Sequence, residues 1–200
     1  MSNVKKHLLE AATRLFSKHG YANTSVQQIC IEAGVSKGAL YHHYKSKDAI
    51  LYGIYQPLLE MQIDSLQEII KQPSLLADRL FLAAEDVGRT CLERIDELTV
   101  FIQSMHLLEP ETKSLVSRQR RHYHQIFSDL IQEAQRHQVI RPDVHPDLLI
   151  NQLFGPVHYS TTWYSKGGKS TPDELARQIA SMWLDGIKPL TEPLEASNQT

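Results

Sequence analysis

The sequence contains only two cysteines among its 200 residues, Cys30 and Cys91, and they lie far apart with no Cys-x-x-Cys pair. This spacing does not suggest a disulfide framework or a zinc site, and we expect both thiols to be small buried groups. No apolar run approaches the roughly 18 residues that a membrane-spanning helix needs. Glu10 and Arg14 interrupt the apolar pattern near the N-terminus, which a signal peptide does not tolerate. We therefore predict a cytoplasmic protein with no membrane partner.

Motifs of enzyme catalysis are also missing. There is no nucleophile elbow, no His-Glu-x-x-His pair, no glycine-rich phosphate loop and no pair of acidic residues singled out by its spacing. The sequence shows no useful length of strand-like alternation and no internal repeat. Its 42% hydrophobic and 22% charged residues suit a globular chain with a sizeable core. We therefore expect no catalytic residue, no cofactor and no metal, and an all-α enzyme is kept as an alternative.

The net charge of -2 conceals an uneven distribution of charged residues along the chain. Residues 1–50 contain seven Lys or Arg and three acidic residues, a net charge of +4, whereas residues 51–200 carry -6. A basic head on an acidic body is typical of a protein that presents one end to a polyanion. The motifs within residues 1–50 have to decide whether this polyanion is nucleic acid.

Apolar residues near the N-terminus recur with the period of an amphipathic helix. Positions 8, 11, 12, 15 and 16 lie on one helical face, and the letters HGY at positions 19–21 end this helix. Thr24 or Ser25 then caps a second helix, Gly34 ends it, and Ser36 caps a third. Two short helices joined by a glycine-bearing turn and braced by a longer one predict a helix-turn-helix DNA-binding domain in residues 1–47.

The rest of the chain is predicted to be helical too, which gives an all-α fold of about nine helices. A helix over residues 48–71 connects the first domain to a second domain over residues 48–188. The further predicted helices span residues 75–93, 95–108, 112–138, 146–165 and 172–186. Thr171, Pro172 and Glu174 mark the start of the last helix as N-cap, first-turn proline and capping-box acid. Residues 189–200 are predicted to be a flexible tail.

The segment GVSKGALYHHYKSK at positions 34–47 suggests how the third helix would approach DNA. Leu40 and Tyr44 point to the core, whereas Gly38 and Ala39 leave the outer surface bare, so that the helix can enter a major groove closely. Basic and hydroxyl side chains around this surface suit base edges or phosphate oxygens. The predicted DNA-binding residues are Thr24, Ser25, Ser36, Lys37, Gly38, Ala39, Tyr41, His42, His43 and Lys47.

Paired histidines raise the alternative of a metal site. His42 and His43 diverge by about 100° on a helix, so their imidazoles cannot easily bind one ion. His122 and His124 lie two residues apart and point to opposite sides of a helix. We therefore predict that these histidines bind no metal.

The first 50 residues resemble the DNA-binding domain of the TetR family of bacterial transcriptional regulators. The family pattern combines a helix ending F-x-x-x-G-Y, a T-S/T cap and the turn A-G-V-S-x-G-x-L-Y, and this sequence reads FSKHGYANTSVQQICIEAGVSKGALYHHYKSKDAIL. Cys30 replaces the usual alanine and Tyr44 the usual phenylalanine. The resemblance implies a ligand-responsive repressor that binds a palindromic DNA operator as a homodimer, with one recognition helix per subunit.

Residues 153–176, LFGPVHYSTTWYSKGGKSTPDELA, are similar to a branch of the family that regulates fatty-acid and steroid degradation and responds to acyl-CoA thioesters. The segment 118–127 places arginine, histidine and tyrosine side chains on one helix, where they can hold phosphates and stack on an adenine. The predicted effector-binding residues are Phe101, Met105, Arg118, Arg121, His122, Ile126, Phe127, Leu130 and Phe154, and Phe81, Arg120 and Tyr123 are further candidates. The alternatives are a solvated basic face and a multidrug-type repressor that responds to hydrophobic compounds.

The resemblance also implies that the last two helices form a four-helix bundle with a second copy of the chain. The predicted interface residues are Leu149, Leu153, Val157, Leu175, Ile179, Met182 and Trp183, and Ile187 would extend the same seam. The alternative is that some of these side chains fill the core of the single subunit.

Overall fold

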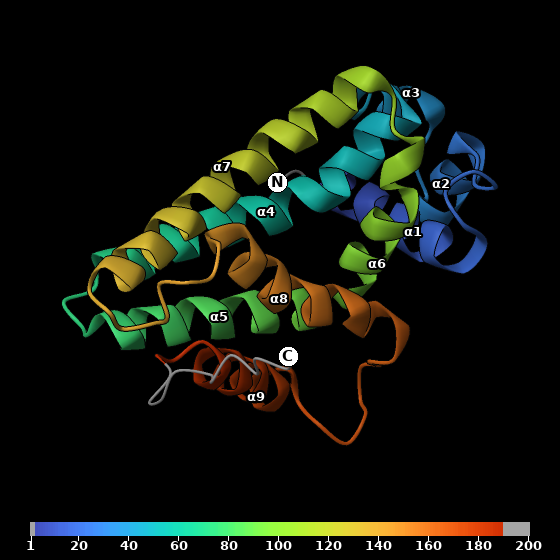
Figure 1. Cartoon of the computed structure of the whole chain (residues 1–200). Coiled ribbons are helices and arrows are strands. Elements are labelled where there is room, and N and C mark those ends of the chain that lie inside the picture. The colour runs from blue at the N-terminus through green and yellow to red at the C-terminus, as the bar shows by residue number, and fades with distance from the viewer. Residues whose placement is uncertain (1–2, 190–200) are drawn as a thin grey trace, which may run out of the picture.

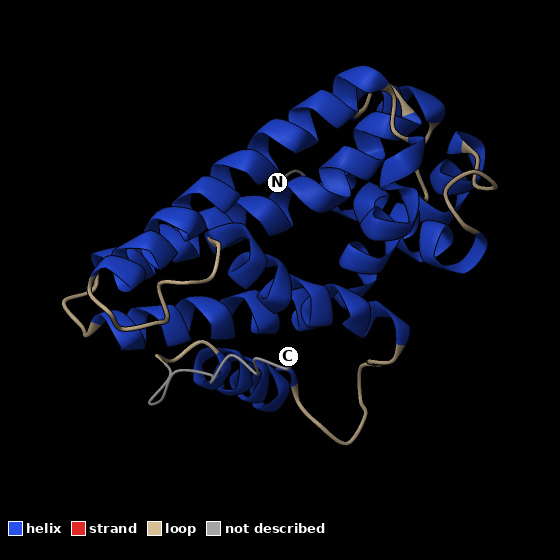
Figure 2. Ribbon diagram, in the orientation of Figure 1, coloured by secondary structure: helices blue, strands red, loops and turns tan. Residues whose placement is uncertain are grey.

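The computed structural model describes residues 3–189, which form nine α-helices and two short 3-10 helices with no β-strand in that range (Figure 1 and Figure 2). The α-helices are α1 (Asn3–His19), α2 (Val26–Ala33), α3 (Lys37–His43), α4 (Lys47–Lys71), α5 (Leu76–Glu93), α6 (Ile95–Ser104), α7 (Pro110–Arg136), α8 (Pro146–Tyr159) and α9 (Pro172–Gly186). The short helices are η1 (Met105–Leu107) and η2 (Ser160–Thr162). The predicted all-α fold is confirmed. The predicted tail beyond residue 189 lies outside the described residues.

The helices α1, α2 and α3 form a small head with its own apolar core, on the right of Figure 1. Phe16, Ile29 and Leu40, one from each helix, are at most 1% exposed. Gly34 ends α2 with a φ of 66°, a left-handed conformation that glycine adopts without steric cost. The chain turns sharply there, and Ser36 caps α3 by accepting a hydrogen bond from the backbone N–H of Ala39 at 3.1 Å.

One long helix, α4, belongs to both the head and the larger body. Its N-cap is Ser46, whose hydroxyl accepts from the backbone N–H of Ala49 at 3.0 Å. From the head it extends beside α7 to the far end of the molecule (Figure 1). Pro57 lies inside α4, and the helix continues through it to Lys71. The helix α4 contacts α1 of the head and α5, α6 and α7 of the body.

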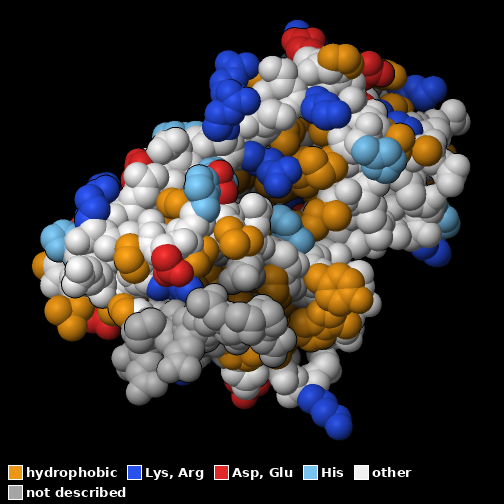
Figure 3. Space-filling view, viewed as in Figure 1, with side chains coloured by type: hydrophobic (Ala, Val, Ile, Leu, Met, Phe, Trp, Pro, Cys, Tyr) orange, Lys and Arg blue, Asp and Glu red, His pale blue; other side chains and the backbone are white. Residues whose placement is uncertain are grey.

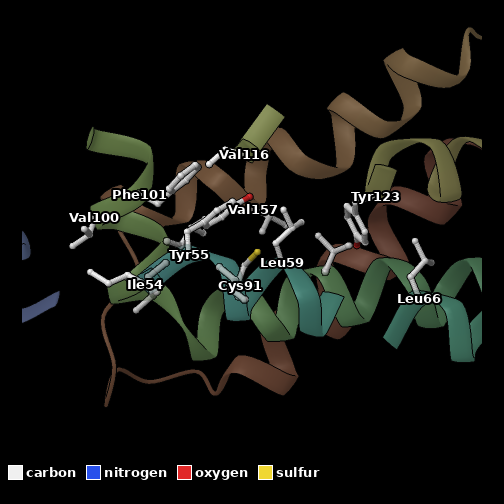
Figure 4. Close-up of a cluster of buried hydrophobic side chains, with 14 of the residues drawn as sticks. Ile54, Tyr55, Leu59, Leu66, Cys91, Val100, Phe101, Val116, Tyr123 and Val157 are labelled. Carbon is white, nitrogen blue, oxygen red and sulfur yellow. The ribbon is translucent and has the colours of Figure 1, made fainter. Parts of the chain in front are cut away.

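The body is built around α5, whose inner residues Leu80, Ala84 and Val87 have no exposed surface. One side of α5 packs against α9, and at Gly88 the backbones approach so closely that an added Cβ would lie 3.0 Å from Cα of Ala176. The other side of α5 packs against α4, α7 and α8. Figure 4 shows that the buried apolar side chains of α4, α5, α6, α7 and α8 share one core.

Several helix ends differ from the prediction. The helix α6 ends at Ser104 and α8 ends at Tyr159, earlier than expected, because each tightens into a 3-10 turn. The helix α7 begins earlier than expected, with Pro110 in its first turn. Among the described helices, none combines the length and the apolar character that crossing a membrane requires.

Candidate nucleic-acid interface and internal cavity

The head presents a shallow polar surface along α3. Tyr41 is 53% exposed, and an added Cβ at Gly38 would meet only the hydroxyl oxygen of Ser36, at 3.8 Å. The predicted DNA-binding residues that are exposed on the head are Ser25, Ser36, Lys37, Gly38, Tyr41 and His42, and Ala39 and His43 are half-buried. This surface can approach a groove closely because no bulky side chain covers its centre. Contact of these residues with DNA stays a prediction.

Two of the predicted DNA-binding residues, Thr24 and Lys47, form hydrogen bonds within the head, and their contact with DNA stays a prediction. Thr24 is 2% exposed, and its hydroxyl donates to the carbonyl of Gly20 at 2.9 Å, because Ser25 rather than Thr24 caps α2. The ammonium group of Lys47 donates to the carbonyls of Tyr21 at 2.8 Å and of Thr24 at 3.1 Å. It also lies 4.3 Å from the centre of the Tyr21 ring. Lys47 therefore holds the loop between α1 and α2.

The histidines of the head contact each other rather than converging on a shared point. The rings of His42 and His43 meet edge-on, with 5.0 Å between their centres. Across residues 3–189, no group of three or more His, Cys, Asp or Glu is arranged to hold a metal ion.

A buried carboxylate joins the head to the body. Asp48, in the first turn of α4, is 8% exposed and accepts a hydrogen bond from the hydroxyl of Tyr21 in the head. Its other oxygen accepts from the backbone N–H of Glu109, the residue before α7, at 2.6 Å. Burial and the Asp48 carboxylate together raise the pKa of Tyr21, which keeps its hydroxyl a donor.

A cavity of about 210 Å³ lies in the body, among α4, α5, α6, α7 and α8. It is lined by Tyr55, Leu58, Leu59, Gln62, Cys91, Leu98, Arg120, Tyr123, His124, Ile150, Asn151, Phe154, Gly155 and His158. The lining residues from α4, α5 and α6 are buried, whereas Arg120, Asn151 and Gly155 are exposed. The mouth therefore lies between α7 and α8. On that face, Figure 3 shows basic and histidine side chains next to hydrophobic ones.

The cavity wall is neutral inside and basic at the mouth. Burial, followed by the charge of Arg120, lowers the pKa of His158 to about 4, so its imidazole is uncharged at neutral pH. Burial raises the pKa of Tyr55 and of Cys91 to about 12 and keeps both protonated. The guanidinium of Arg120 is therefore the permanent positive charge of the lining.

The structure divides the predicted effector-binding residues among several places. Phe154 lines the cavity, as do Arg120 and Tyr123 from the wider candidate set. Phe101 and Phe127 are buried core residues outside the lining, and Phe101 stacks on the ring of Tyr55. Ile126 and Leu130 line a separate groove against α4. Met105 and Phe81 are half-buried. The remaining predicted residues, Arg118, Arg121 and His122, are exposed on α7. Sequence reasoning missed Gln62, Asn151 and His158, which lie on separate helices with no shared local pattern.

Four predicted interface residues are buried within the single subunit, which favours the alternative that they fill its own core. Leu149, Leu153, Val157 and Trp183 are at most 7% exposed, because they pack α8 and α9 against the rest of the body. The alternative also holds for Ile187, which is 2% exposed, and Leu175 and Ile179 are half-buried. Met182 remains on the surface at 76% exposure. Leu148, Tyr159 and Trp163 are large exposed apolar residues of the same region, each at least 53% exposed, that the sequence reasoning did not assign.

Known proteins share both parts of this architecture. Residues 8–53 match the family described as bacterial regulatory proteins, tetR family, and residues 74–187 match the family described as tetracyclin repressor-like, C-terminal domain. The HTH-type transcriptional repressor KstR2 of Rhodococcus jostii (strain RHA1) is 27% identical over 191 residues, which cover 93% of this chain and 92% of that protein.

Two solved structures have the same fold. The ketosteroid transcriptional regulator KstR2 of Mycobacterium tuberculosis superposes with a TM-score of 0.84 at 21% identity, over 95% of this chain and 97% of that one. AibR, solved in complex with isovaleryl coenzyme A and operator DNA, has a TM-score of 0.76 at 23% identity, over 94% of this chain and 99% of that one. The chain belongs to the tetR family of bacterial regulatory proteins.

Proposed function

We propose that the protein represses transcription as a homodimer on a palindromic operator and leaves the DNA when an acyl-CoA thioester binds in the body. The observation that carries the effector assignment is the cavity with an uncharged interior and Arg120 at its mouth. An apolar acyl group suits the interior, and a guanidinium at the entrance suits the phosphates of coenzyme A.

The size of the cavity fits the acyl group of such a ligand rather than the whole molecule. Its 210 Å³ is below the roughly 300–1,000 Å³ that pockets for drug-sized ligands occupy. The nucleotide would therefore lie outside, at the mouth between α7 and α8, where Arg120 is exposed and the neighbouring Arg121 is exposed on α7. AibR, which shares this fold, was solved in complex with isovaleryl coenzyme A, and this supports a short acyl thioester as the class of effector.

The DNA-binding half of the proposal rests on the head. The residues Lys37, Gly38 and Tyr41 lie on the exposed face of α3, which is free of bulky side chains at its centre. We expect α3 to enter the major groove with Gly38 and Ala39 nearest the bases and with Lys37 and Tyr41 on phosphates or base edges.

The dimer is supported by the apolar side chains that α8, α9 and the turn after α8 leave exposed. Leu148, Tyr159, Trp163 and Met182 are between 53% and 76% exposed. A two-fold axis that pairs this surface with its copy would cover these side chains and set the two heads at a fixed separation. That separation has to match the roughly 34 Å between successive major grooves.

The test is release of the protein from its operator. The operator is first selected from random DNA with the purified protein, and binding is then followed by fluorescence anisotropy while acyl-CoA thioesters are added. Coenzyme A and the matching free acids serve as ligand controls. Release by thioesters but not by the controls, and its weakening in Arg120→Ala, is the expected result. Release by uncharged hydrophobic compounds alone would replace the proposal with the multidrug-type alternative.

A further inference from the structure

The inner end of the cavity is more polar than an acyl pocket requires. Tyr55 and Gln62 of α4, Cys91 of α5 and Tyr123 of α7 line it, and each is at most 7% exposed. Within the described part of the chain, their side chains share a single hydrogen bond, from Nε2 of Gln62 to Sγ of Cys91 at 3.5 Å. A thiol is a weak acceptor, so this bond satisfies little of the amide.

Gln62 is unusual on its own helix face. It shares the α4 face that lines the cavity with Leu58 and Leu59, and Leu98 of α6 closes the same space. A leucine at position 62 would continue this apolar pattern. A carboxamide has two donors and an oxygen acceptor, and among residues 3–189 its oxygen accepts no hydrogen bond from a protein group. The amide therefore faces the cavity with hydrogen-bonding capacity that water or a ligand can use.

Tyr123 faces the same end of the cavity. Burial raises the pKa of its hydroxyl well above the ordinary value, and the neighbouring Cys91, Asp86 and Tyr55 raise this pKa further. The phenol therefore stays protonated and can donate. No hydrogen bond of this hydroxyl to another side chain or to the backbone occurs in the described residues, although the ring is packed against Phe127 and Phe154.

We propose that the effector carries a hydrogen-bonding oxygen, as a ketone or hydroxyl group, on the part of its acyl chain that reaches Gln62 and Tyr123. This inference rests on the proposed function and adds the chemical class of the acyl group. A ketone accepts from the amide of Gln62 and from the phenol of Tyr123, and a hydroxyl group can also donate to the amide oxygen. A saturated hydrocarbon chain would displace water from both groups and leave them unpaired.

The experiment compares pairs of thioesters of equal chain length. Each pair consists of a saturated acyl-CoA and the acyl-CoA with one ketone, and the ketone is moved along the chain from pair to pair. Valeryl-CoA and levulinoyl-CoA form the shortest pair. At one ketone position, we expect half-release of operator DNA at about a tenfold lower concentration than with the saturated partner. In Gln62→Leu the preference should reverse in favour of the saturated chain.

The matched control is Gln67→Leu, the same substitution on the same helix, at a residue that lines the groove outside the cavity. It should keep the preference of the unaltered protein. Tyr123→Phe provides a second variant in case Gln62→Leu does not fold, and it should reduce the preference for the ketone. Equal half-release concentrations within every pair would overturn the inference while leaving the thioester response intact.

Direct binding separates this inference from the proposed function. Calorimetry with the same acyl groups on N-acetylcysteamine, which lacks the nucleotide, measures the cavity without the DNA and without the phosphates. A preference for the ketone in this experiment supports the inference even if no acyl-CoA releases DNA. Failure of every acyl-CoA to release DNA would contradict the proposed function but not the inference. Equal affinity within every pair, or no binding by any member, overturns the inference.

Discussion

Lys47 shows how a lysine in a DNA-binding head can stabilise a loop from inside. Its ammonium group donates to the carbonyls of Tyr21 and Thr24 and lies over the Tyr21 ring. A lysine that follows a helix-turn-helix unit in sequence is equally suited to a phosphate, and only the folded position of the loop between α1 and α2 distinguishes the two roles. The salt dependence of DNA binding distinguishes the two roles, because a lysine that contacts phosphate contributes to it and a lysine that holds a loop does not.

We expect Lys47→Met to weaken DNA binding without changing its salt dependence. The substitution removes hydrogen bonds to the loop, worth about 1–2 kcal/mol of folding free energy, and no phosphate contact. The slope of log K against log salt should stay that of the unaltered protein. Lys37→Met is the matched control, because Lys37 is exposed on α3 and its loss should reduce the slope by about 1. A reduced slope in Lys47→Met would show that Lys47 contacts phosphate.

His158 makes the stability of the body depend on pH. Its pKa is about 4 in the folded protein and about 6.5 in the unfolded chain, so the unfolded chain binds more protons between these values. This contribution is fully present above pH 6.5 and is lost as the pH falls toward 4, up to about 3 kcal/mol. Arg120 and His124 of α7 line the same cavity as this imidazole, and the charge of Arg120 opposes its protonation.

Urea unfolding of the unaltered protein and of His158→Asn at several pH values from 4 to 7 measures this contribution. The variant cannot titrate at position 158, so it should lose less stability than the unaltered protein as the pH falls. Parallel pH profiles for the two proteins would show that the imidazole is not held neutral by the fold.

At the scale of the element, the start of α7 and the start of α4 are fastened to the head at one point. Asp48 accepts from Tyr21 on one side and from the backbone of Glu109 on the other. The same α7 carries Arg120 and Tyr123 into the cavity, four helical turns or fewer from Glu109. A displacement of α7 on effector binding would therefore act on Asp48. Through Tyr21 it would reach the loop between α1 and α2, which Lys47 also holds.

We expect Asp48→Asn to reduce the coupling between effector and DNA. The amide keeps one acceptor oxygen and loses the charge, so one of the two bonds weakens or breaks. The measurement is the ratio of DNA dissociation constants with and without saturating effector, which should fall several-fold toward 1. Asp64→Asn, an exposed aspartate on the same helix, is the control and should leave the ratio unchanged. An unaltered ratio in Asp48→Asn would exclude this route.

At the scale of the whole molecule, we expect the exposed apolar surface of α8, α9 and the turn between them to form the interface of the proposed dimer. We expect Met182→Glu to shift the protein toward monomer, because it places charge on a side chain that is 76% exposed in the subunit and covered in the proposed dimer. Sedimentation velocity over a range of concentrations measures the shift. Leu75→Glu is the matched control, because Leu75 is 74% exposed and comes directly before α5, outside α8, α9 and the turn between them. Equal dimer content in both variants would place the interface elsewhere.

Sequence reasoning succeeded where the signal is local and failed where it depends on distant helices. Caps at Ser36 and Thr171 were predictable because a capping side chain bonds within its own first turn. The inner and outer faces of α8 were not separable, since Leu148 and Leu149 are both apolar and only one is buried. A period of 3.6 residues identifies an apolar stripe but does not tell whether the same chain or a second copy covers it. The cavity could not be predicted because Gln62, Asn151 and His158 are brought together only by packing.

The contact of Gly88 with Ala176 has a mechanical consequence for the dimer. Side chains normally separate two packed helices. Here the backbones lie so close that a Cβ added at Gly88 would be only 3.0 Å from Cα of Ala176. We therefore expect α9 to move together with α5. Because α5 contributes Cys91 to the cavity and α9 carries Met182 on its outer side, a ligand that displaces α5 would change the angle at which the two subunits of the proposed dimer meet.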